Sequence, residues 1–272
     1  MRVACVMMQR NEINALEPWL RYHSYLFGIE NLYVIDHGSD HHSVMSILDK
    51  YEKKGLHIFR LSKRADYRLK GEFVSQILMA AAASQAYDIL FPLDCDEFLA
   101  IRRENGQYSC DRKTIFEYLG TLLGRKVVYE VKENLVNILE LPGKFHALPY
   151  QKVFFLGDYC GVVDHGSHQD VSGQQKIIEE TRLIYIHFHL KKYERQVAAS
   201  LEKLRPYVDV DDRAELEVFR GPGWHLVSHI LGGEKAYLDT MYMMRIGSGA
   251  VEVEGLLSLF QKLGIKPLFT EI

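Results

Sequence analysis

The chain has little of several features that would place it in a common class of protein. Its 272 residues include only four cysteines, and none of them stand in a C-x-x-C pair, so the sequence indicates neither a disulfide scaffold nor a zinc ribbon. No apolar run approaches the ~20 residues that a membrane-spanning helix needs. The formal net charge is −3, which argues against a strongly basic surface for nucleic acid. We therefore expect no nucleic-acid partner and no transmembrane segment.

The chain does have enough apolar side chain for a sizeable core. Apolar residues make up 47% of the sequence, and its length fits one large α/β domain or one domain with an elaborated tail. The apolar run over residues 3–8 lacks a signal-peptide cleavage pattern and is better explained as a buried strand. We expect a cytoplasmic protein in a reducing compartment, and peripheral contact with the inner face of the membrane is left open.

The first hundred residues alternate strand and helix patterns. Apolar side chains recur every three or four residues over 13–27, which is typical of one buried helix face. Strands are expected over residues 3–8, 32–35, 56–61 and 88–93, and further helices over 44–51 and 73–86. Short connections of this kind favour parallel strands with right-handed crossovers. The predicted fold is therefore α/β, with a Rossmann-like, mostly parallel sheet flanked by helices.

The pattern is less regular after residue 100. Helices are expected over 114–123, 193–204, 235–244 and 255–263, and strands over 126–131, 152–156 and 183–187. The stretch 157–173 is rich in Gly, Asp and His and is predicted to be a long functional loop. We divide the chain into a ligand-binding domain, residues 1–205, and a helical C-terminal extension packed on it, residues 206–272.

Polar clusters follow three of the predicted strands. They are Gln9-Arg10-Asn11-Glu12, Asp36-His37-Gly38-Ser39-Asp40 and Asp94-Cys95-Asp96-Glu97. In an open sheet of this kind ligands bind outside the carboxyl ends of the strands, so all three clusters are expected to face one crevice. No glycine-rich dinucleotide loop follows the first strand, which counts against a nicotinamide enzyme.

The acidic cluster after the fourth strand is the strongest local signal. Its three carboxylates lie within four residues, where they raise one another's pKa, and a divalent cation removes that cost. Mg²⁺ and Mn²⁺ prefer oxygen ligands and keep open positions for phosphate and water. The plain alternative is a solvated acidic turn. The position at the crevice edge favours a metal–phosphate site at Asp94 and Asp96.

Other polar residues near the crevice have two possible roles each. Asp36 can accept hydrogen bonds from a ribose or base, or it can simply precede a helix that is capped by Ser39 or Asp40. His187 and His189 are two residues apart on a predicted strand and share a face, so one of them could complete a metal site. Several basic residues could neutralise a diphosphate or be solvated charges: Arg10, Arg68, Lys70, Lys191 and Lys192.

The order of these motifs resembles GT-A-fold glycosyltransferases of the family-2-like group, in the subgroup with a D-x-D-E-F motif. That subgroup has, in order, Lys-Asn-Glu, Glu-Trp-Leu with Tyr-His, Asp-x-x-Ser-x-Asp, the metal motif, and a late strand that ends His-Tyr before Lys-Ser. This chain has Gln9-Arg10-Asn11-Glu12, Glu17-Pro18-Trp19-Leu20 with Tyr22-His23, Asp36 to Asp40, Asp94 to Phe98, and His187-Phe188-His189-Leu190-Lys191-Lys192. Arg10, Phe188 and Lys192 depart from the pattern. The resemblance covers residues 3–100 well and 150–204 more loosely.

The resemblance implies transfer of a hexose-like sugar from a UDP- or GDP-sugar to a hydroxyl of a glycan or glycolipid, with Mn²⁺ or Mg²⁺ as cofactor. By that resemblance the metal would bridge the diphosphate and would be held by Asp94, Asp96 and His187. The nucleotide sugar would be bound by Gln9, Arg10, Asn11, Glu12, Asp36, Ser39, Arg68, Lys70 and Asp94. Lys191 would meet the leaving diphosphate as a point charge. Asp164 would be the base of an inverting enzyme, with Asp158 and Glu97 as alternatives, whereas a retaining mechanism needs no such base.

Three other functions stay open at this point. A nucleotidyltransferase would use the same carboxylates but usually has a glycine-rich loop with a basic residue after the first strand. A metal-dependent hydrolase would use Asp94, Asp96 and the histidines, yet such enzymes more often have histidines early in the chain. A non-catalytic protein of the same fold that binds nucleotide sugars would have less need of all the carboxylates.

Overall fold

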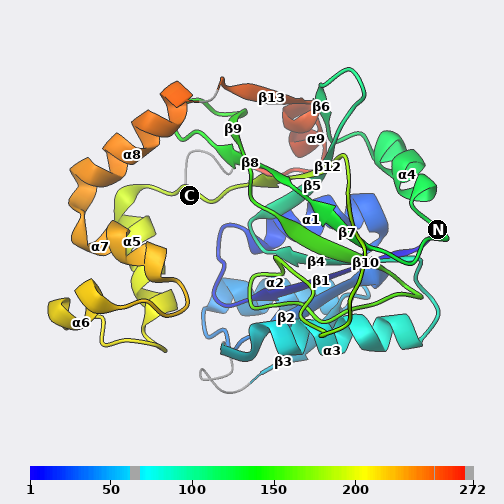
Figure 1. The fold of residues 1–272 in the computed structure, drawn as a ribbon, viewed down its shortest axis with the longest axis horizontal. Helices are drawn as coiled ribbons and strands as arrows, with labels where there is room; N and C mark the ends of the chain where they lie inside the picture. Colours follow the sequence, from blue (N-terminus) through cyan, green and yellow to red (C-terminus); the bar gives the residue numbers. More distant parts are fainter. Residues whose placement is uncertain (62–67, 248, 267–272) are drawn as a thin grey trace.

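The computed structural model describes residues 1–61, 68–247 and 249–266, and its centre is a seven-stranded sheet (Figure 1). In their order across the sheet the strands are β11 (Ile178–Glu180), β7 (Val128–Val131), β10 (Lys152–Leu156), β4 (Ile89–Asp94), β1 (Val3–Gln9), β2 (Leu32–Asp36) and β3 (His57–Arg60). Strand β1 runs parallel to β2 and β4, and β2 runs parallel to β3. Only β10 is antiparallel to its neighbours, β4 and β7. The predicted mostly parallel sheet flanked by helices is confirmed.

Helices cover both faces of this sheet, and the side chains of β1 divide between them. Val3, Cys5 and Met7 pack into the core that contains helices α1 (Leu16–Phe27) and α2 (His42–Glu52). The alternate residues of β1, from Ala4 to Met8, pack against α3 (Lys70–Ala83) on the opposite face. Because successive side chains of a strand point to opposite faces, a strand buried on both faces is apolar throughout. This explains the unbroken apolar run at residues 3–8.

A second sheet of six short strands closes on itself beside the first one (Figure 1). Its strands are β12 (Leu183–His187), β5 (Glu97–Arg102), β6 (Tyr108–Ser109), β13 (Val251–Glu254), β9 (Lys144–Leu148) and β8 (Glu133–Asn137). Helix α4 (Arg112–Thr121) follows β6. The chain passes from β4 of the first sheet to β5 of the second through the two residues Cys95 and Asp96. The acidic motif is therefore the junction of the two sheets.

After β12 the chain forms a group of short helices at the left of Figure 1, and one of them packs on Val136 of β8 through Tyr237 and Met241. They are α5 (Tyr193–Leu204), α6 (Arg213–Val218), the 3₁₀ helix η3 (Trp224–Leu226), α7 (Val227–Leu231) and α8 (Gly233–Gly247). A small core of their own includes Leu204, Leu216 and Leu226. The chain then returns to the sheets through β13 and α9 (Leu256–Lys262), whose Phe260 belongs to the main core. The division of the chain at residue 205 stays a prediction.

Most predicted elements are present, with shifted ends. The strands at 152–156 and 183–187 and the helix at 193–204 have the predicted bounds. The helix predicted over 73–86 starts at Lys70 and ends at Ala83, because Gln85 has a φ of +52°, which a right-handed helix does not allow. The sequence analysis missed β5, β6, β8, β9, β11 and β13, along with the short helices α6 and α7. Among the described residues, no helix combines the length and apolar composition that a bilayer crossing requires.

Candidate functional site

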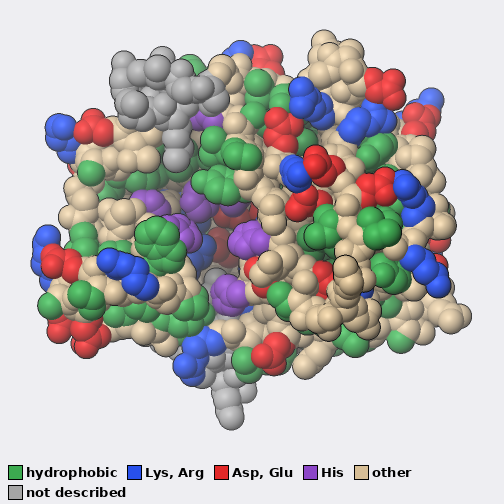
Figure 2. Space-filling model, viewed as in Figure 1, with side chains coloured by type: hydrophobic (Ala, Val, Ile, Leu, Met, Phe, Trp, Pro, Cys, Tyr) green, Lys and Arg blue, Asp and Glu red, His purple; other side chains and the backbone are tan. Residues whose placement is uncertain are grey.

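A cavity of about 1550 Å³ lies between the sheets and the C-terminal helices. Its sheet side is formed by residues that follow the carboxyl ends of β1, β2 and β4, and its other side by α5, α7 and α8. The three polar clusters contribute Gln9 to Glu12, His37, Asp40 and Asp94 to Glu97 to its lining. Histidine side chains gather around this hollow in Figure 2. The structure thus brings the three strand-end clusters to one crevice, as strand order predicted.

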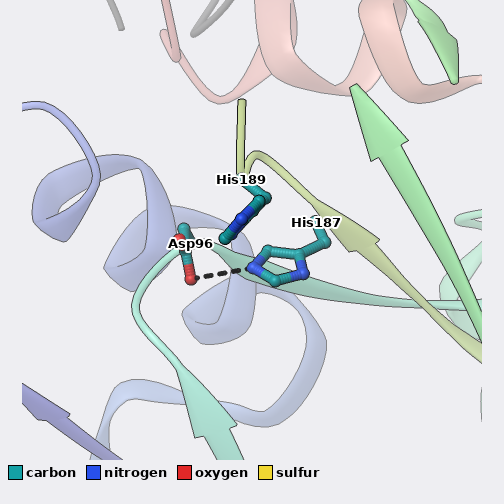
Figure 3. Close-up of side chains that lie close together, drawn as sticks. All are labelled: Asp96, His187 and His189. Atoms are coloured by element: carbon teal, nitrogen blue, oxygen red, sulfur yellow. Dashed lines mark ion pairs between the residues drawn. The ribbon is translucent and has the colours of Figure 1, made fainter. Parts of the chain in front are cut away.

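One group of side chains in the cavity has the arrangement of a metal site (Figure 3). One ligand atom each of Asp96, His187 and His189 lie within 4.8 Å of one another. Asp96 Oδ1 is 3.5 Å from His187 Nε2. Asp96 comes from the turn between the two sheets, and the histidines come from the end of β12 and just beyond it. We call this group the Asp96 cluster.

The strand pattern explains why both histidines reach the same point. His187, at the end of β12, and His189 lie on either side of Phe188, which is fully buried in the main core. Because side chains alternate along an extended chain, a core-facing Phe188 turns both neighbours to the cavity. The Phe188 backbone N–H also donates to the Asp96 carbonyl oxygen at 2.9 Å, which fixes the turn against the strand.

The electrostatics of the Asp96 cluster favour a charged carboxylate next to an imidazolium. Burial alone would raise the pKa of Asp96, but His187 and Lys191 hold that pKa below its usual value. Burial alone would lower the pKa of His187, but the carboxylates of Asp96 and Glu97 raise it. For His189, burial and the neighbouring His187 both lower the pKa, so this imidazole is neutral. A divalent cation bound here would take the place of the His187 proton and would be coordinated by two imidazoles and a carboxylate.

Glu97 lies next to the Asp96 cluster, on the far side of the His187 ring from Asp96. Its side chain is fully buried, and it stands opposite His187 in the β5–β12 pairing. Its Oε2 accepts a hydrogen bond from the Asp94 backbone N–H at 3.0 Å and is 2.8 Å from Lys152 Nζ. Its Oε1 has no hydrogen-bond partner among the described residues and lies 3.9 Å from His187 Nδ1. A carboxylate beside the outer nitrogen of a metal-binding histidine orients the ring and favours the tautomer whose other nitrogen binds the metal.

Asp94 belongs to a different group, which we call the lysine cluster. Its two carboxylate oxygens each lie 2.5 Å from a lysine ammonium, Oδ1 from Lys70 and Oδ2 from Lys152. Burial would raise the pKa of Asp94, but the two lysines hold it well below its usual value. Both oxygens are therefore occupied by cations, and the structure does not bring Asp94 into the Asp96 cluster, where the sequence placed it as a metal ligand.

The residues predicted to hold the nucleoside bind chiefly to one another. Asp36 is buried and accepts a hydrogen bond from Gln9 Nε2 at 2.6 Å. Ser39 Oγ accepts from the Asn11 backbone N–H at 3.0 Å. Asn11 Oδ1 accepts from the backbone N–H groups of Asp40 and His41, at the start of α2. Neither Asp36 nor Ser39 is among the lining residues of the cavity, whereas Gln9 and Asn11 are.

The remaining predicted residues differ in position. Arg10, Glu12, Arg68 and Lys70 line the cavity. Burial raises the pKa of Glu12, although Lys191 opposes that shift. Lys191 acts electrostatically on both Glu12 and Asp96 but is not among the lining residues.

Asp164 is held within its own loop and is absent from the cavity lining. Its Oδ1 accepts hydrogen bonds from the backbone N–H groups of His168 at 2.5 Å and Gln169 at 3.4 Å. The structure therefore does not bring the first candidate for the base into the cavity. His168, four residues further on, does line it.

Sequence reasoning missed Lys152 and did not choose His189. Lys152 starts an apolar strand, where a single lysine is most simply interpreted as a solvated end, although its side chain is 5% exposed. His189 follows His187 with the period of two that places both on one face, so the signal for it was in the sequence.

Comparisons with known proteins add little to this picture. No protein-family model matches the chain, and no curated protein sequence matches it. Among solved structures, S. aureus TarS 1–349 is 12% identical, with a TM-score of 0.38 over 85% of this chain and 72% of that one. A cytidylyltransferase from Leptospira borgpetersenii is 15% identical, with a TM-score of 0.32 over 58% of this chain and 61% of that one.

A third similar structure is glucosyl-3-phosphoglycerate synthase from Mycobacterium tuberculosis in complex with Mn²⁺, UDP-glucose and phosphoglyceric acid. It is 19% identical, with a TM-score of 0.29, and the match covers 52% of this chain and 47% of that one. The chain thus spans less than two thirds of the cytidylyltransferase and of the synthase. Likenesses at these TM-scores carry no argument about activity, so the function has to be argued from the residues.

Proposed function

We propose that the chain is a metal-dependent glycosyltransferase that moves a sugar from a nucleotide diphosphate sugar to an acceptor hydroxyl. The observation that carries this proposal is the Asp96 cluster, which lies at the carboxyl edge of a mostly parallel sheet, inside a large cavity. The three residues of this cluster also belong to the two last motifs in which the chain resembles the GT-A family-2-like group. A ligand cavity in an open α/β sheet is expected at this edge.

The donor set fits Mn²⁺ better than Mg²⁺. Mg²⁺ is bound almost entirely by oxygen, whereas imidazole nitrogen suits transition metals. The Asp96 cluster supplies one carboxylate and two imidazoles, and the orphaned Glu97 Oε1 lies behind His187. When bound there, the metal would neutralise the charge that develops on the leaving diphosphate. We therefore narrow the cofactor to Mn²⁺ or a metal of similar preference.

The reaction exchanges two bonds at the anomeric carbon. The bond from that carbon to the diphosphate oxygen breaks, the acceptor oxygen forms a new bond to the carbon, and the acceptor proton passes to a base. Arg10 and Arg68 line the cavity and can bind the diphosphate through charge-assisted hydrogen bonds. Asp164 remains the proposed base of an inverting reaction, and it would have to release the backbone N–H groups of His168 and Gln169.

The test is metal-dependent nucleotide binding by the full chain. UDP and GDP, each with and without Mn²⁺, should raise the melting temperature only when the metal is present; a ligand at ~100 times its Kd stabilises by roughly 2.7 kcal/mol. Asp96→Ala should abolish that shift. Asp211→Ala removes an exposed carboxylate outside the cavity lining and is the matched control. Equal shifts in wild type and Asp96→Ala would show that the cluster is not the metal site.

A metal-dependent hydrolase is the second candidate, because a metal held by the same two imidazoles and carboxylate could activate water. The two functions differ in their products. A hydrolase releases free sugar from a UDP- or GDP-sugar at full rate without any acceptor, whereas a transferase requires one. The cytoplasmic location stays a prediction from the sequence.

A further inference from the structure

The two histidines of the Asp96 cluster are held in place by different means. His187 is the last residue of β12, where it pairs with Glu97 of β5 on one side and with Val136 of β8 on the other. His189 lies beyond this pairing, because β12 ends at His187. Pairing with two neighbouring strands therefore fixes the backbone at His187, whereas the backbone at His189 depends on other contacts.

The side chain of Asn137 supplies such contacts next to His189. Asn137 is the last residue of β8, and its side chain is fully buried. Its Nδ2 donates a hydrogen bond to the Leu190 carbonyl oxygen at 2.9 Å, and its Oδ1 accepts one from the Leu190 backbone N–H at 2.9 Å. A side-chain amide offers the same donor and acceptor as a peptide group, so Asn137 takes the place of a neighbouring strand for one residue.

These bonds act on His189 through the planarity of the peptide bond. The Leu190 N–H belongs to the peptide group that begins at the His189 Cα, and all six atoms of a peptide group, that Cα included, lie close to one plane. On the other side of His189, the Phe188 backbone N–H donates to the Asp96 carbonyl oxygen at 2.9 Å. The backbone is thus anchored before and after His189, which fixes the position from which its imidazole extends.

Apolar packing alone does not set this orientation. The Leu190 side chain is buried in a small core with Val136, Tyr237 and Met241. Because such packing is non-directional, it holds the segment near β8 and α8 without fixing the rotation of the peptide groups. Hydrogen bonds are directional, and both bonds to Asn137 have the length typical of N–H···O bonds. Asn137 therefore sets the orientation of the backbone beside His189.

We propose that Asn137 is a positioning residue for the metal site. It holds the backbone beside His189 so that this imidazole comes within 4.8 Å of the ligand atoms of Asp96 and His187. Ligands that are held in place before the ion arrives lose less conformational freedom when it binds, so the site binds the ion more tightly. This inference rests on the proposed function, of which it uses only the metal site and neither the sugar nor the acceptor.

The test is a double-mutant cycle on Mn²⁺ affinity, measured by calorimetry on the full chain without nucleotide. Asn137→Leu keeps nearly the same side-chain volume and removes both hydrogen bonds. We expect it to weaken Mn²⁺ binding about 10–100-fold, the range for residues that support metal ligands. The double variant Asn137→Leu/His189→Ala should bind Mn²⁺ no more weakly than His189→Ala alone, because the imidazole that Asn137 positions is already absent.

A second measurement reports the ligands themselves. Co²⁺ accepts imidazole ligands as Mn²⁺ does, and its visible absorption depends on the number and geometry of the ligands. The Co²⁺ spectrum of Asn137→Leu should match that of His189→Ala and differ from that of wild type. A role in stability alone would not produce this match.

Asn31→Leu is the matched control. Asn31 is also a buried asparagine, and its Nδ2 donates to the Phe27 carbonyl oxygen at 2.6 Å, outside the cavity lining. This variant should lose stability but keep the Mn²⁺ affinity and the Co²⁺ spectrum of wild type. If Asn137→Leu does not fold, Asn137→Ser takes its place in the cycle, since a serine hydroxyl can restore one of the two bonds.

The outcomes separate this proposal from the proposed function. An Asn137 variant with the Mn²⁺ affinity and Co²⁺ spectrum of wild type would overturn the role of Asn137. So would full additivity in the cycle while metal binding still requires Asp96, and in both cases the metal site stands. A wild-type chain that binds neither Mn²⁺ nor Co²⁺ would overturn the metal site, and with it both proposals.

Discussion

Asp94 and Asp96 are two residues apart in one motif, yet they lie in groups of opposite character. In the lysine cluster, both oxygens of Asp94 are 2.5 Å from the ammonium groups of Lys70 and Lys152. In the Asp96 cluster, the carboxylate faces two imidazoles, whose nitrogens can release protons and bind metal. Lysine cannot coordinate a metal while it is protonated. The first cluster is therefore closed by its own cations, and the second is open to an added one.

The comparison shows that the partner of a carboxylate, rather than the motif that contains it, decides its role. Asp94 ends β4 and turns to β10 and α3, which supply the lysines. Asp96 lies in the turn and meets the end of β12. Glu97 joins the two groups, because one oxygen is next to Lys152 and the other next to His187. A change in one cluster can therefore be distinguished from a change in the other.

The largest effect is expected from Lys152→Met. Burial would lower the pKa of Lys152, but Asp94 and Glu97 raise it, so the ammonium is charged and compensates two carboxylates. Removal of one partner from a buried ion pair costs about 3–5 kcal/mol, because a buried charge is left uncompensated. The free energy of unfolding, measured in urea, should fall by about that amount.

Lys132→Met is the control, because its ammonium also pairs with two glutamates but lies at the surface, half exposed. Ion pairs at the surface contribute little to stability because water screens them, so this variant should be close to wild type. Similar losses in the two variants would mean that burial does not set the strength of the lysine cluster.

The next effect separates the two aspartates. Asp94→Asn should lower the free energy of unfolding by about 2 kcal/mol, because two largely buried lysines lose their shared counterion, but Mn²⁺ affinity should stay nearly intact. Asp96→Asn should change the free energy of unfolding less and weaken the affinity for Mn²⁺ more than about 100-fold. Loss of a residue that only supports a metal ligand already lowers metal affinity about 10–100-fold, and loss of the ligand itself should lower it further. If Asp94→Asn also removes Mn²⁺ binding, Asp94 is a ligand after all, as the sequence suggested.

The first hundred residues of the fold could be predicted because each element is local. Apolar runs marked the strands, and periodic side chains marked the helices. The second sheet could not be predicted in this way. Its strands are two to six residues long, and β13 joins β6 and β9 from more than a hundred residues away. Pairing over such separations depends on tertiary packing, which a local pattern does not record.

The sequence predicted where the site lies, but it did not predict most of the contacts within it. Strand order placed the three polar clusters at one edge, and the cavity lies there. The contacts of Lys152 required the fold, because it reaches the motif from a strand that sequence cannot register against it. The place of His187 beside Asp96, in contrast, was already implied by the family resemblance. The role of Asp164 as the base stays a prediction. Its carboxylate is not in the cavity lining and accepts hydrogen bonds from the backbone of its own loop, an arrangement that a sequence pattern does not record.

A smaller effect is expected from Glu97→Gln, which leaves the volume of the side chain unchanged. The amide can still fill the space beside His187 but no longer carries the charge that orients the ring and favours its metal-binding form. Mn²⁺ affinity should fall about 10–100-fold. Glu133→Gln, on β8 of the same sheet, is the control for loss of a glutamate charge. Unchanged Mn²⁺ affinity in Glu97→Gln would show that Glu97 acts only in the lysine cluster and does not support the metal site.

The smallest effect extends the comparison from carboxylates to histidines. His23 is fully buried in an aromatic group that includes Trp19 and Phe98. One ring nitrogen, Nδ1, is 3.0 Å from the Trp19 carbonyl oxygen, so it carries the proton, and Nε2 accepts from the Leu99 backbone N–H at 3.5 Å. Burial lowers the pKa of His23 to about 3, whereas the carboxylates beside His187 raise its pKa.

The low pKa of His23 implies a loss of stability in acid. In the unfolded chain a histidine binds a proton below about pH 6.5, whereas folded His23 stays neutral down to about pH 3. Stability rises with pH wherever the unfolded state binds more protons, so the contribution of His23 is lost as the pH falls from 6.5 towards 3. Between pH 7 and 5.5 this amounts to about 1 kcal/mol. His23→Gln keeps a donor and an acceptor but does not titrate, so its free energy of unfolding should fall less than that of wild type over this interval. Parallel pH profiles for the two proteins would show that His23 is protonated in the folded core, and that burial does not suppress its charge where no carboxylate is near.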